Sequence, residues 1–243
     1  MKSIGKYMIF LSRTVTDMEP WHVYVRLFVE ECMRIGISSV YIVTIISSFI
    51  GAVTAVQTAY NLVSPLIPKS LIGTIVRDMT ILELAPTITA IVFAGKVGSN
   101  IAGGLGTMRI TEQIDAIEVM GINATSYLVF PKILAGLVTY PLLVILAAFL
   151  AVGGGYLAAT LTGQVTAVEY VYGIRLDFVE FNVTFMLIKS VVFAFLVTTI
   201  SAYKGYYTRG GALEVGESST KAVTTSCIAI LLADYLLAQM LVF

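Results

Sequence analysis

The chain has 243 residues, of which 58% are apolar and only 12% are charged. A soluble domain carries about 25% charged residues, so half the usual charge cannot cover a soluble surface of this size. The composition excludes an ordinary cytosolic enzyme, a disordered tail and a coiled-coil rod, and it indicates a membrane protein. The 15 basic and 15 acidic residues balance, so no net charge attracts nucleic acid.

Near the N-terminus, residues 20–34 predict a helix with Pro20 in its first turn. Trp21, Val25 and Phe28 share one face of this helix, and charged residues occupy another. This pattern is typical of a helix lying in the membrane interface, with the tryptophan at headgroup level. A helix packed against its own protein would show the same pattern, and the sequence does not choose between the two.

Two long stretches, 35–68 and 133–168, contain no Asp, Glu, Lys or Arg. A membrane span needs about 20 mostly apolar residues, and three shorter apolar windows can each be extended to that length. We therefore expect an all-α polytopic membrane protein, with an N-terminal interfacial helix in residues 1–34 and a transmembrane domain over 35–243. The five transmembrane helices are expected at about 35–59, 75–102, 128–160, 182–203 and 220–242.

The distribution of Lys and Arg near the helix ends predicts the orientation. One side has eleven basic residues, against three on the other, with Lys189 inside the fourth span. The eleven are Lys2, Lys6, Arg13, Arg26, Arg34, Lys96, Arg109, Lys132, Lys204, Arg209 and Lys221; the three are Lys69, Arg77 and Arg175. We expect a cytoplasmic N-terminus and a C-terminus on the opposite side.

The second span carries small residues at every fourth position, which allows two helix backbones to approach closely. They form two rows, Ala94-Gly98-Ala102 and Gly95-Ser99-Gly103. The close packing is expected within the chain or across a dimer. The nearby glycines do not form a phosphate-binding loop, because Gly95-Lys96-Val97 lacks the Ser or Thr that the motif requires after the lysine. If this chain carries out energy-dependent transport, the energy must therefore come from a partner or from an ion gradient.

Residues 106–121 read GTMRITEQIDAIEVMG and predict a short amphipathic helix on the cytoplasmic side. Isoleucines recur at helical spacing, and Glu112, Asp115 and Glu118 form an acidic stripe on a different face. Gly121 is a plausible C-terminal stop. A solvated connector is the alternative, but the apolar stripe needs a surface to cover.

The stretch from Glu83 to Gly136 closely resembles the MlaE/YrbE family of ABC transporter permeases. The run LGTMRxTEQIDAxxVM, over residues 105–120, is the most specific part. Further similarity lies between Phe49 and Gln57, in Leu187–Phe193, and from Tyr203 to Asp234-Tyr235, so that the resemblance covers about residues 35–243.

The resemblance implies a homodimeric permease subunit in the bacterial inner membrane, with its N-terminus cytoplasmic and its C-terminus periplasmic. It implies three partners: a cytoplasmic ABC ATPase, a periplasmic MCE-domain protein and a phospholipid or related lipid as substrate. Residues 107–120 would be the coupling helix that contacts the ATPase, through Arg109, Glu112, Asp115 and Glu118. Arg109 has two open interpretations, the ATPase contact and anionic headgroups. ATP and Mg²⁺ would bind in the partner, so this chain is expected to hold no cofactor, no metal and no catalytic residue.

Ionisable residues inside a span are functional candidates. Glu83 precedes Pro86 in the second span, and in the family the matching glutamate lies near the lipid cavity. It is expected to contact a lipid headgroup or to pair with Arg77 or another charge. Leu82 and Ala85 depart from residues common in the family, so the headgroup chemistry can differ. Gln57 is a further candidate for the lipid pathway or for a hydrogen bond between helices.

Lys189 and Asp234 are the second set of intramembrane charges. At 1.5 Å per residue, both lie roughly 10–14 Å below the outer surface of the membrane. Their similar depth predicts an ion pair between the fourth and fifth spans, in preference to a substrate contact.

Two other functions compete with the permease. A stand-alone secondary transporter or channel would show inverted repeats and a midplane ion site, whereas five spans do not divide into halves. An intramembrane enzyme needs a clustered nucleophile and base, and the single histidine, His22, lies in the N-terminal segment. We therefore expect a non-enzymatic protein.

Overall fold

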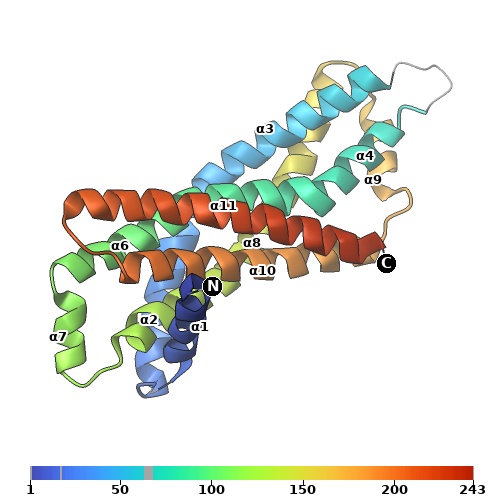
Figure 1. Cartoon of the computed structure of the whole chain (residues 1–243). Helices are drawn as coiled ribbons and strands as arrows, with labels where there is room; N and C mark the ends of the chain where they lie inside the picture. The colour runs from blue at the N-terminus through green and yellow to red at the C-terminus, as the bar shows by residue number, and fades with distance from the viewer. Residues whose placement is uncertain (1, 17, 63–67, 243) are drawn as a thin grey trace. The chain divides into compact units, whose positions relative to one another are not determined.

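The computed structural model describes residues 2–16, 18–62 and 68–242, in which every regular element is a helix (Figure 1). Labels with η mark π-helical segments. The elements are α1 (Lys2–Val15), α2 (Trp21–Cys32), η1 (Met33–Ile37), α3 (Ser38–Asn61), α4 (Leu71–Met79), η2 (Thr80–Ile88), α5 (Thr89–Phe93), η3 (Ala94–Gly98), α6 (Ser99–Ile110), α7 (Gln113–Val119), α8 (Ala124–Leu161), α9 (Ala167–Arg175), α10 (Glu180–Tyr206) and α11 (Ala212–Val242).

Five helical runs in the described residues are long and apolar enough to cross a membrane. They are Trp21–Asn61, Leu71–Ile110, Ala124–Leu161, Glu180–Tyr206 and Ala212–Met240. The predicted all-α fold with five spans is confirmed. Each run is longer than predicted, because the helices continue past the apolar window into polar residues that the sequence assigns to loops.

The N-terminal segment differs from the expectation in two ways. The helix expected at 20–34 is not separate, since α2 continues through the π-helical turn η1 into α3 without a break. A further helix, α1, precedes it and was not predicted. Tyr24 in α2 is buried and its hydroxyl is 2.8 Å from Ser126 Oγ, whereas Trp21 remains exposed. One face of α2 therefore packs on its own protein, and the tryptophan face is left open.

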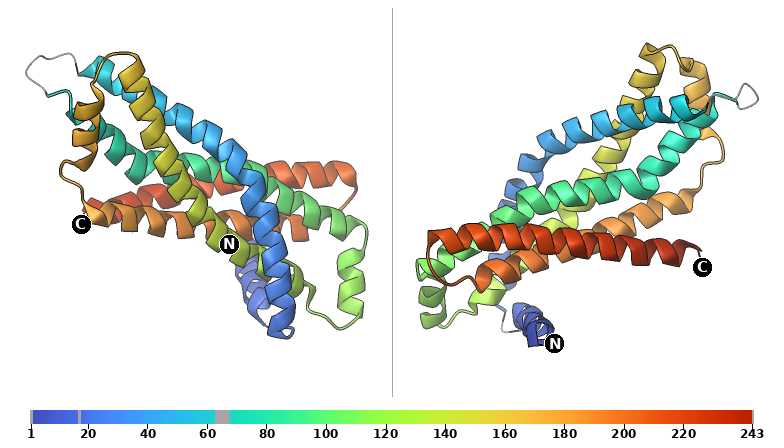
Figure 2. Two further views of the ribbon diagram at one scale, coloured as in Figure 1. Left: turned by 180° about the vertical axis from the view of Figure 1, so that it is seen from behind. Right: turned by 45° about the horizontal axis from the view of Figure 1, so that its top comes forward.

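The chain forms two compact units, each assembled from separate stretches of sequence. The first unit contains residues 1–39, 90–140 and 191–243. Within it α6 lies against α11, as the green and red helices of Figure 1 and Figure 2 show. The small residues of the second span pack against α10: a Cβ on Gly98 would lie 2.7 Å from Ser201 Oγ, and one on Gly205 would lie 2.5 Å from the Ala102 carbonyl. The row Ala94-Gly98-Ala102 thus serves packing within the chain.

Helix α1 is attached to the first unit by an aromatic cluster. Phe10 is fully buried among three tyrosines of the α10 end, with ring centroids 5.5 to 5.8 Å apart. The Tyr7 hydroxyl donates to Thr199 Oγ1 at 2.6 Å, and burial raises the pKa of Tyr7. Rings meeting edge to face stabilise such contacts by about 0.5–1.5 kcal/mol each beyond their buried area.

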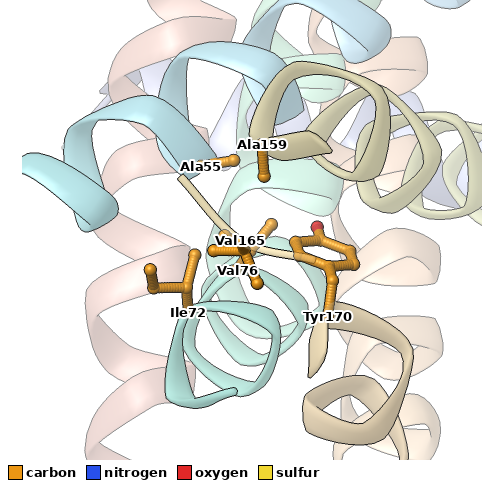
Figure 3. Packing of buried hydrophobic residues seen from close by; sticks show 6 residues of the cluster. All are labelled: Ala55, Ile72, Val76, Ala159, Val165 and Tyr170. Carbon is orange, nitrogen blue, oxygen red and sulfur yellow. The ribbon is translucent and has the colours of Figure 1, made fainter. Parts of the chain in front are cut away.

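The second unit contains residues 40–89 and 141–190. Its apolar core brings together side chains from α3, α4, α8 and α9, with Val165 just ahead of α9 (Figure 3). The core residues are Ala55, Ile72, Val76, Ala159, Val165 and Tyr170. Glycines allow α3 and α8 to touch, because a Cβ on Gly51 would overlap the Ala151 carbonyl and one on Gly154 would overlap the Ser48 carbonyl.

Helix α9 lies in the segment between the third and fourth spans and was not predicted. Its start is a capping box, in which Thr166 and Glu169 each bond the other's backbone N–H. Its end is held by Arg77 of α4, whose Nη1 donates to the carbonyls of Ile174 and Leu176 at 2.7 Å. A cation suits the negative end of a helix dipole. Arg77 therefore caps α9, and it pairs with its neighbour Asp78.

Candidate functional site

Two sets of residues emerge as candidates, and the first is the corner between α6 and α7 in the first unit. The expected helix at 107–120 is divided, because α6 ends at Ile110 and α7 begins at Gln113. Glu112 between them has φ 59°, a left-handed conformation that interrupts the helical hydrogen bonds. Arg109 Nη1 donates to Asp115 Oδ1 at 2.6 Å, so an ion pair spans the corner.

The other end of α7 is closed by a Schellman motif. Gly121 has φ 79°, its N–H donates to the Glu118 carbonyl at 3.0 Å, and the Ile122 N–H donates to the Ile117 carbonyl at 3.3 Å. The prediction that Gly121 ends this helix is confirmed. The Glu118 carboxylate also accepts a 2.8 Å hydrogen bond from the Tyr206 hydroxyl of α10. Both ends of α7 are thus fixed to the first unit.

The faces of α7 divide into a buried side and an outward side. Ile114 is fully buried, so part of the predicted apolar stripe covers the protein's own surface. On the outward side Val119 is 87% exposed and Met120 is 67% exposed, next to the exposed Ala116 and Glu112. Large apolar side chains on a rigid, exposed turn of helix are typical of a protein contact. The acidic stripe is used mostly within the chain, since Asp115 and Glu118 have partners there.

The second set is the charge pair of Glu83 and Lys189 in the second unit. Lys189 is fully buried, and its Nζ lies 2.8 Å from Glu83 Oε1. The Glu83 side chain is 50% exposed, so the carboxylate extends from the buried ammonium toward the surface of the unit. The ring of Phe185 lies 5.1 Å from the same ammonium. Of the pairings expected for Glu83, the structure shows one with Lys189, and Arg77 is engaged elsewhere.

The backbone around Glu83 is π-helical, and Pro86 lies inside this segment. In an α-helix the residue at position 86 would donate to the Leu82 carbonyl, but proline has no N–H. Lys189 Nζ donates to that carbonyl at 3.0 Å. The proline, the lysine and the glutamate therefore form one local arrangement. Because π-helical turns are frequent at functional sites, this arrangement is a functional candidate.

The remaining candidates are less defined. Gln57 lies on an exposed face of α3. Asp234 is partly buried in α11 and belongs to the first unit, whereas Lys189 belongs to the second. Their pairing stays a prediction. Sequence reasoning missed Tyr206 as the partner of Glu118 and Arg77 as the cap of α9, and both contacts join residues about 90 to 100 positions apart. The start of α9 did have a local signal in the sequence, the Thr166-x-x-Glu169 pattern of a capping box.

The fold defines a multi-pass membrane protein. The model of the family described as "Permease MlaE" matches residues 28–240, and the chain belongs to this family. It is 36% identical over 239 residues to a probable ABC transporter permease protein of Rickettsia bellii, a match covering 98% of this chain and 92% of the relative. It is 32% identical over 212 residues to a probable ABC transporter permease protein of Synechocystis, covering 87% and 80%.

A plant protein is also similar to this chain. The chloroplast protein TRIGALACTOSYLDIACYLGLYCEROL 1 of Arabidopsis thaliana is 30% identical over 219 residues, which cover 86% of this chain and 60% of the plant protein. The similarity predicted from the run at residues 105–120 is therefore confirmed at the level of the family, and the chain is a permease subunit.

Proposed function

We propose that this chain is the membrane-spanning subunit of an ABC transporter that moves phospholipids or related lipids between the inner and outer membranes. A separate ATPase supplies the energy and binds at α7 on the cytoplasmic side. The permease works as a homodimer with a periplasmic MCE-domain protein. Its N-terminus is cytoplasmic and its C-terminus is periplasmic.

The observation that carries this proposal is the construction of α7. A seven-residue helix is too short to be stable alone, yet an ion pair at one end and a Schellman motif at the other fix it in place. It presents Val119 and Met120 outward. A short helix that is fixed at both ends and has an apolar tip is suited to transmit a conformational change from a bound partner. The names of the bacterial relatives favour an ABC ATPase as that partner.

Two observations support a lipid as substrate. The Glu83 carboxylate is half-exposed inside a predicted span, where it can meet the amine of a headgroup while Lys189 holds it in place. The plant relative bears the name of a diacylglycerol glycolipid. Gln57, exposed on α3, is a second polar group for the lipid path.

The proposal is tested by purifying the tagged permease from native membranes and measuring the bound ATPase and lipid-stimulated ATP hydrolysis. The Val119→Asp/Met120→Asp variant places two charges on the outward face of α7, and we expect it to lose the ATPase. Leu161→Asp is the matched control, since Leu161 is 84% exposed at the end of α8 and is assigned to the opposite side of the membrane. Equal recovery of the ATPase with all three proteins would contradict the docking at α7.

A further inference from the structure

A partly enclosed cavity of about 70 Å³ lies in the first unit, between the α2–η1 junction, the η3–α6 segment and the start of α8. Three basic side chains line it: Arg34, Lys96 and Lys132. The sequence assigns all three to the cytoplasmic side, and they lie in three different helical runs. Lys132 forms an ion pair with Glu31, and both side chains are largely buried.

The other two cations of the cavity contact uncharged oxygens. Arg34 Nη2 donates to Asn100 Oδ1 at 3.3 Å, and Lys96 Nζ donates to the carbonyl of Ser38. Within the described part of the chain, no carboxylate is within salt-bridge distance of Arg34 or Lys96. The cavity therefore has an excess of two positive charges, carried by a guanidinium and an ammonium that are already oriented by hydrogen bonds.

The size and lining of the cavity define what it can hold. One water needs roughly 10–15 Å³ of such space, so the cavity has room for a group about as large as one phosphate. A planar guanidinium binds two phosphate oxygens at once, and a lysine adds a point charge. The rest of the wall is apolar, from Ile35, Val97, Ile101, Leu105 and Met108. An apolar wall suits a phosphate that carries acyl chains better than a free phosphate ion.

We propose that this cavity binds the headgroup phosphate of an anionic phospholipid in the cytoplasmic leaflet. Basic pockets between helices on the cytoplasmic side are suited to anionic headgroups, because the lipid supplies the missing negative charge. The assignment to this leaflet rests on the orientation in the proposed function. The bound lipid would link η1, which contains Arg34, to η3, which contains Lys96 and continues into α6, the helix before α7.

The test measures lipid bound to the purified permease by native mass spectrometry, after incubation with phosphatidylglycerol, with phosphatidylcholine or with inorganic phosphate. The variant is Arg34→Gln/Lys96→Gln. Each cation near an anionic surface contributes about fivefold to affinity, so we expect phosphatidylglycerol binding to weaken about 25-fold. Arg209→Gln/Lys221→Gln also removes one arginine and one lysine, from the segment before α11 and from α11 itself. Neither residue lines the cavity, so this variant should bind like the wild type.

Three results would overturn the proposal: equal binding of phosphatidylglycerol and phosphatidylcholine, unchanged binding by the double variant, or inorganic phosphate replacing the lipid. The single variant Lys96→Gln, with an expected loss of about fivefold, keeps the test valid if the double variant does not fold. No ATPase is needed in this assay. A permease that binds phosphatidylglycerol at these residues but recruits no ATPase would contradict the proposed function alone, and the reverse result would contradict the headgroup site alone.

Discussion

The ammonium of Lys189 is fully buried and lies 2.8 Å from the carboxylate of Glu83, which is itself half-exposed. A buried charge that loses its partner is costly, whereas removing both charges together is often neutral. The lysine also donates to the Leu82 carbonyl, which Pro86 cannot bond because it has no N–H. The pair therefore supports the π-helical segment that presents Glu83.

The first prediction is a double-mutant cycle on this pair. Glu83→Gln should destabilise the protein by about 3 kcal/mol, at the low end for buried pairs because the carboxylate is partly exposed. Glu83→Gln/Lys189→Met should recover most of that loss, since the ammonium and the carboxylate that it contacts are removed together. Thermal unfolding in detergent measures these two variants and the single variant Lys189→Met. If the double variant is as unstable as the sum of the two single variants, the pair does not act as a unit.

The second prediction concerns the contact of α3 and α8. Gly154→Ala should destabilise the protein, because the new Cβ would overlap the Ser48 carbonyl and the two helices would have to separate. A forced shift of packed helices costs about 1–3 kcal/mol. Gly153→Ala is the control, since nothing lies within 4 Å of a Cβ there, and alanine favours a helix over glycine by about 1 kcal/mol. Opposite signs for neighbouring glycines are the expected result in an unfolding assay; equal signs would contradict the close contact.

The third prediction separates stability from coupling at the α6–α7 corner. Glu112 has φ 59°, which costs a non-glycine residue roughly 1 kcal/mol. Glu112→Gly should therefore leave stability unchanged or raise it by up to about 1 kcal/mol. If the carboxylate contacts the ATPase, the same variant should reduce ATPase recovery. Unchanged recovery would show that the residue is important for the turn only.

The fourth prediction is a pH effect at α9. Two hydrogen bonds from Thr166, first from its backbone N–H and then from its hydroxyl, lower the pKa of Glu169 below the usual 4.5. A carboxylate with a lowered pKa stabilises the folded state fully above its unfolded pKa, and this stabilisation is lost as pH falls through the folded pKa. As the pH falls below about 5, the hydrogen-exchange protection of Ala167–Arg175 should therefore decline. This decline should be larger in the wild type than in Glu169→Gln. An identical decline in both proteins would exclude the cap as its cause.

The five spans could be predicted because long apolar stretches with few or no charges are a local property of the sequence. The stop at Gly121 was predictable for the same reason, as a glycine directly after a helical pattern. The continuous helix Trp21–Asn61 was not, because Met33–Ile37 joins α2 to α3 as a π-helical turn and Gly36 within it does not end the helix.

The contacts of the candidate residues depended on long-range folding. Lys189 pairs with Glu83 across 106 positions, and Glu118 meets Tyr206 across 88. The position of Lys189 within a span made it a candidate. Its depth in the membrane could not show which acidic residue it contacts, because acidic residues of different spans can lie at a similar depth. The cavity of Arg34, Lys96 and Lys132 was likewise visible beforehand only as a count of basic residues on one side.

The central claim, that α7 couples an ATPase to lipid movement, is tested most directly in vesicles containing the purified permease with its ATPase. Lipid-stimulated ATP hydrolysis and lipid transfer to acceptor vesicles should both fall to background in Val119→Asp/Met120→Asp and remain at the wild-type level in Leu161→Asp. Wild-type hydrolysis and transfer by the α7 variant, or transfer by the wild-type permease without any ATPase, would contradict the account.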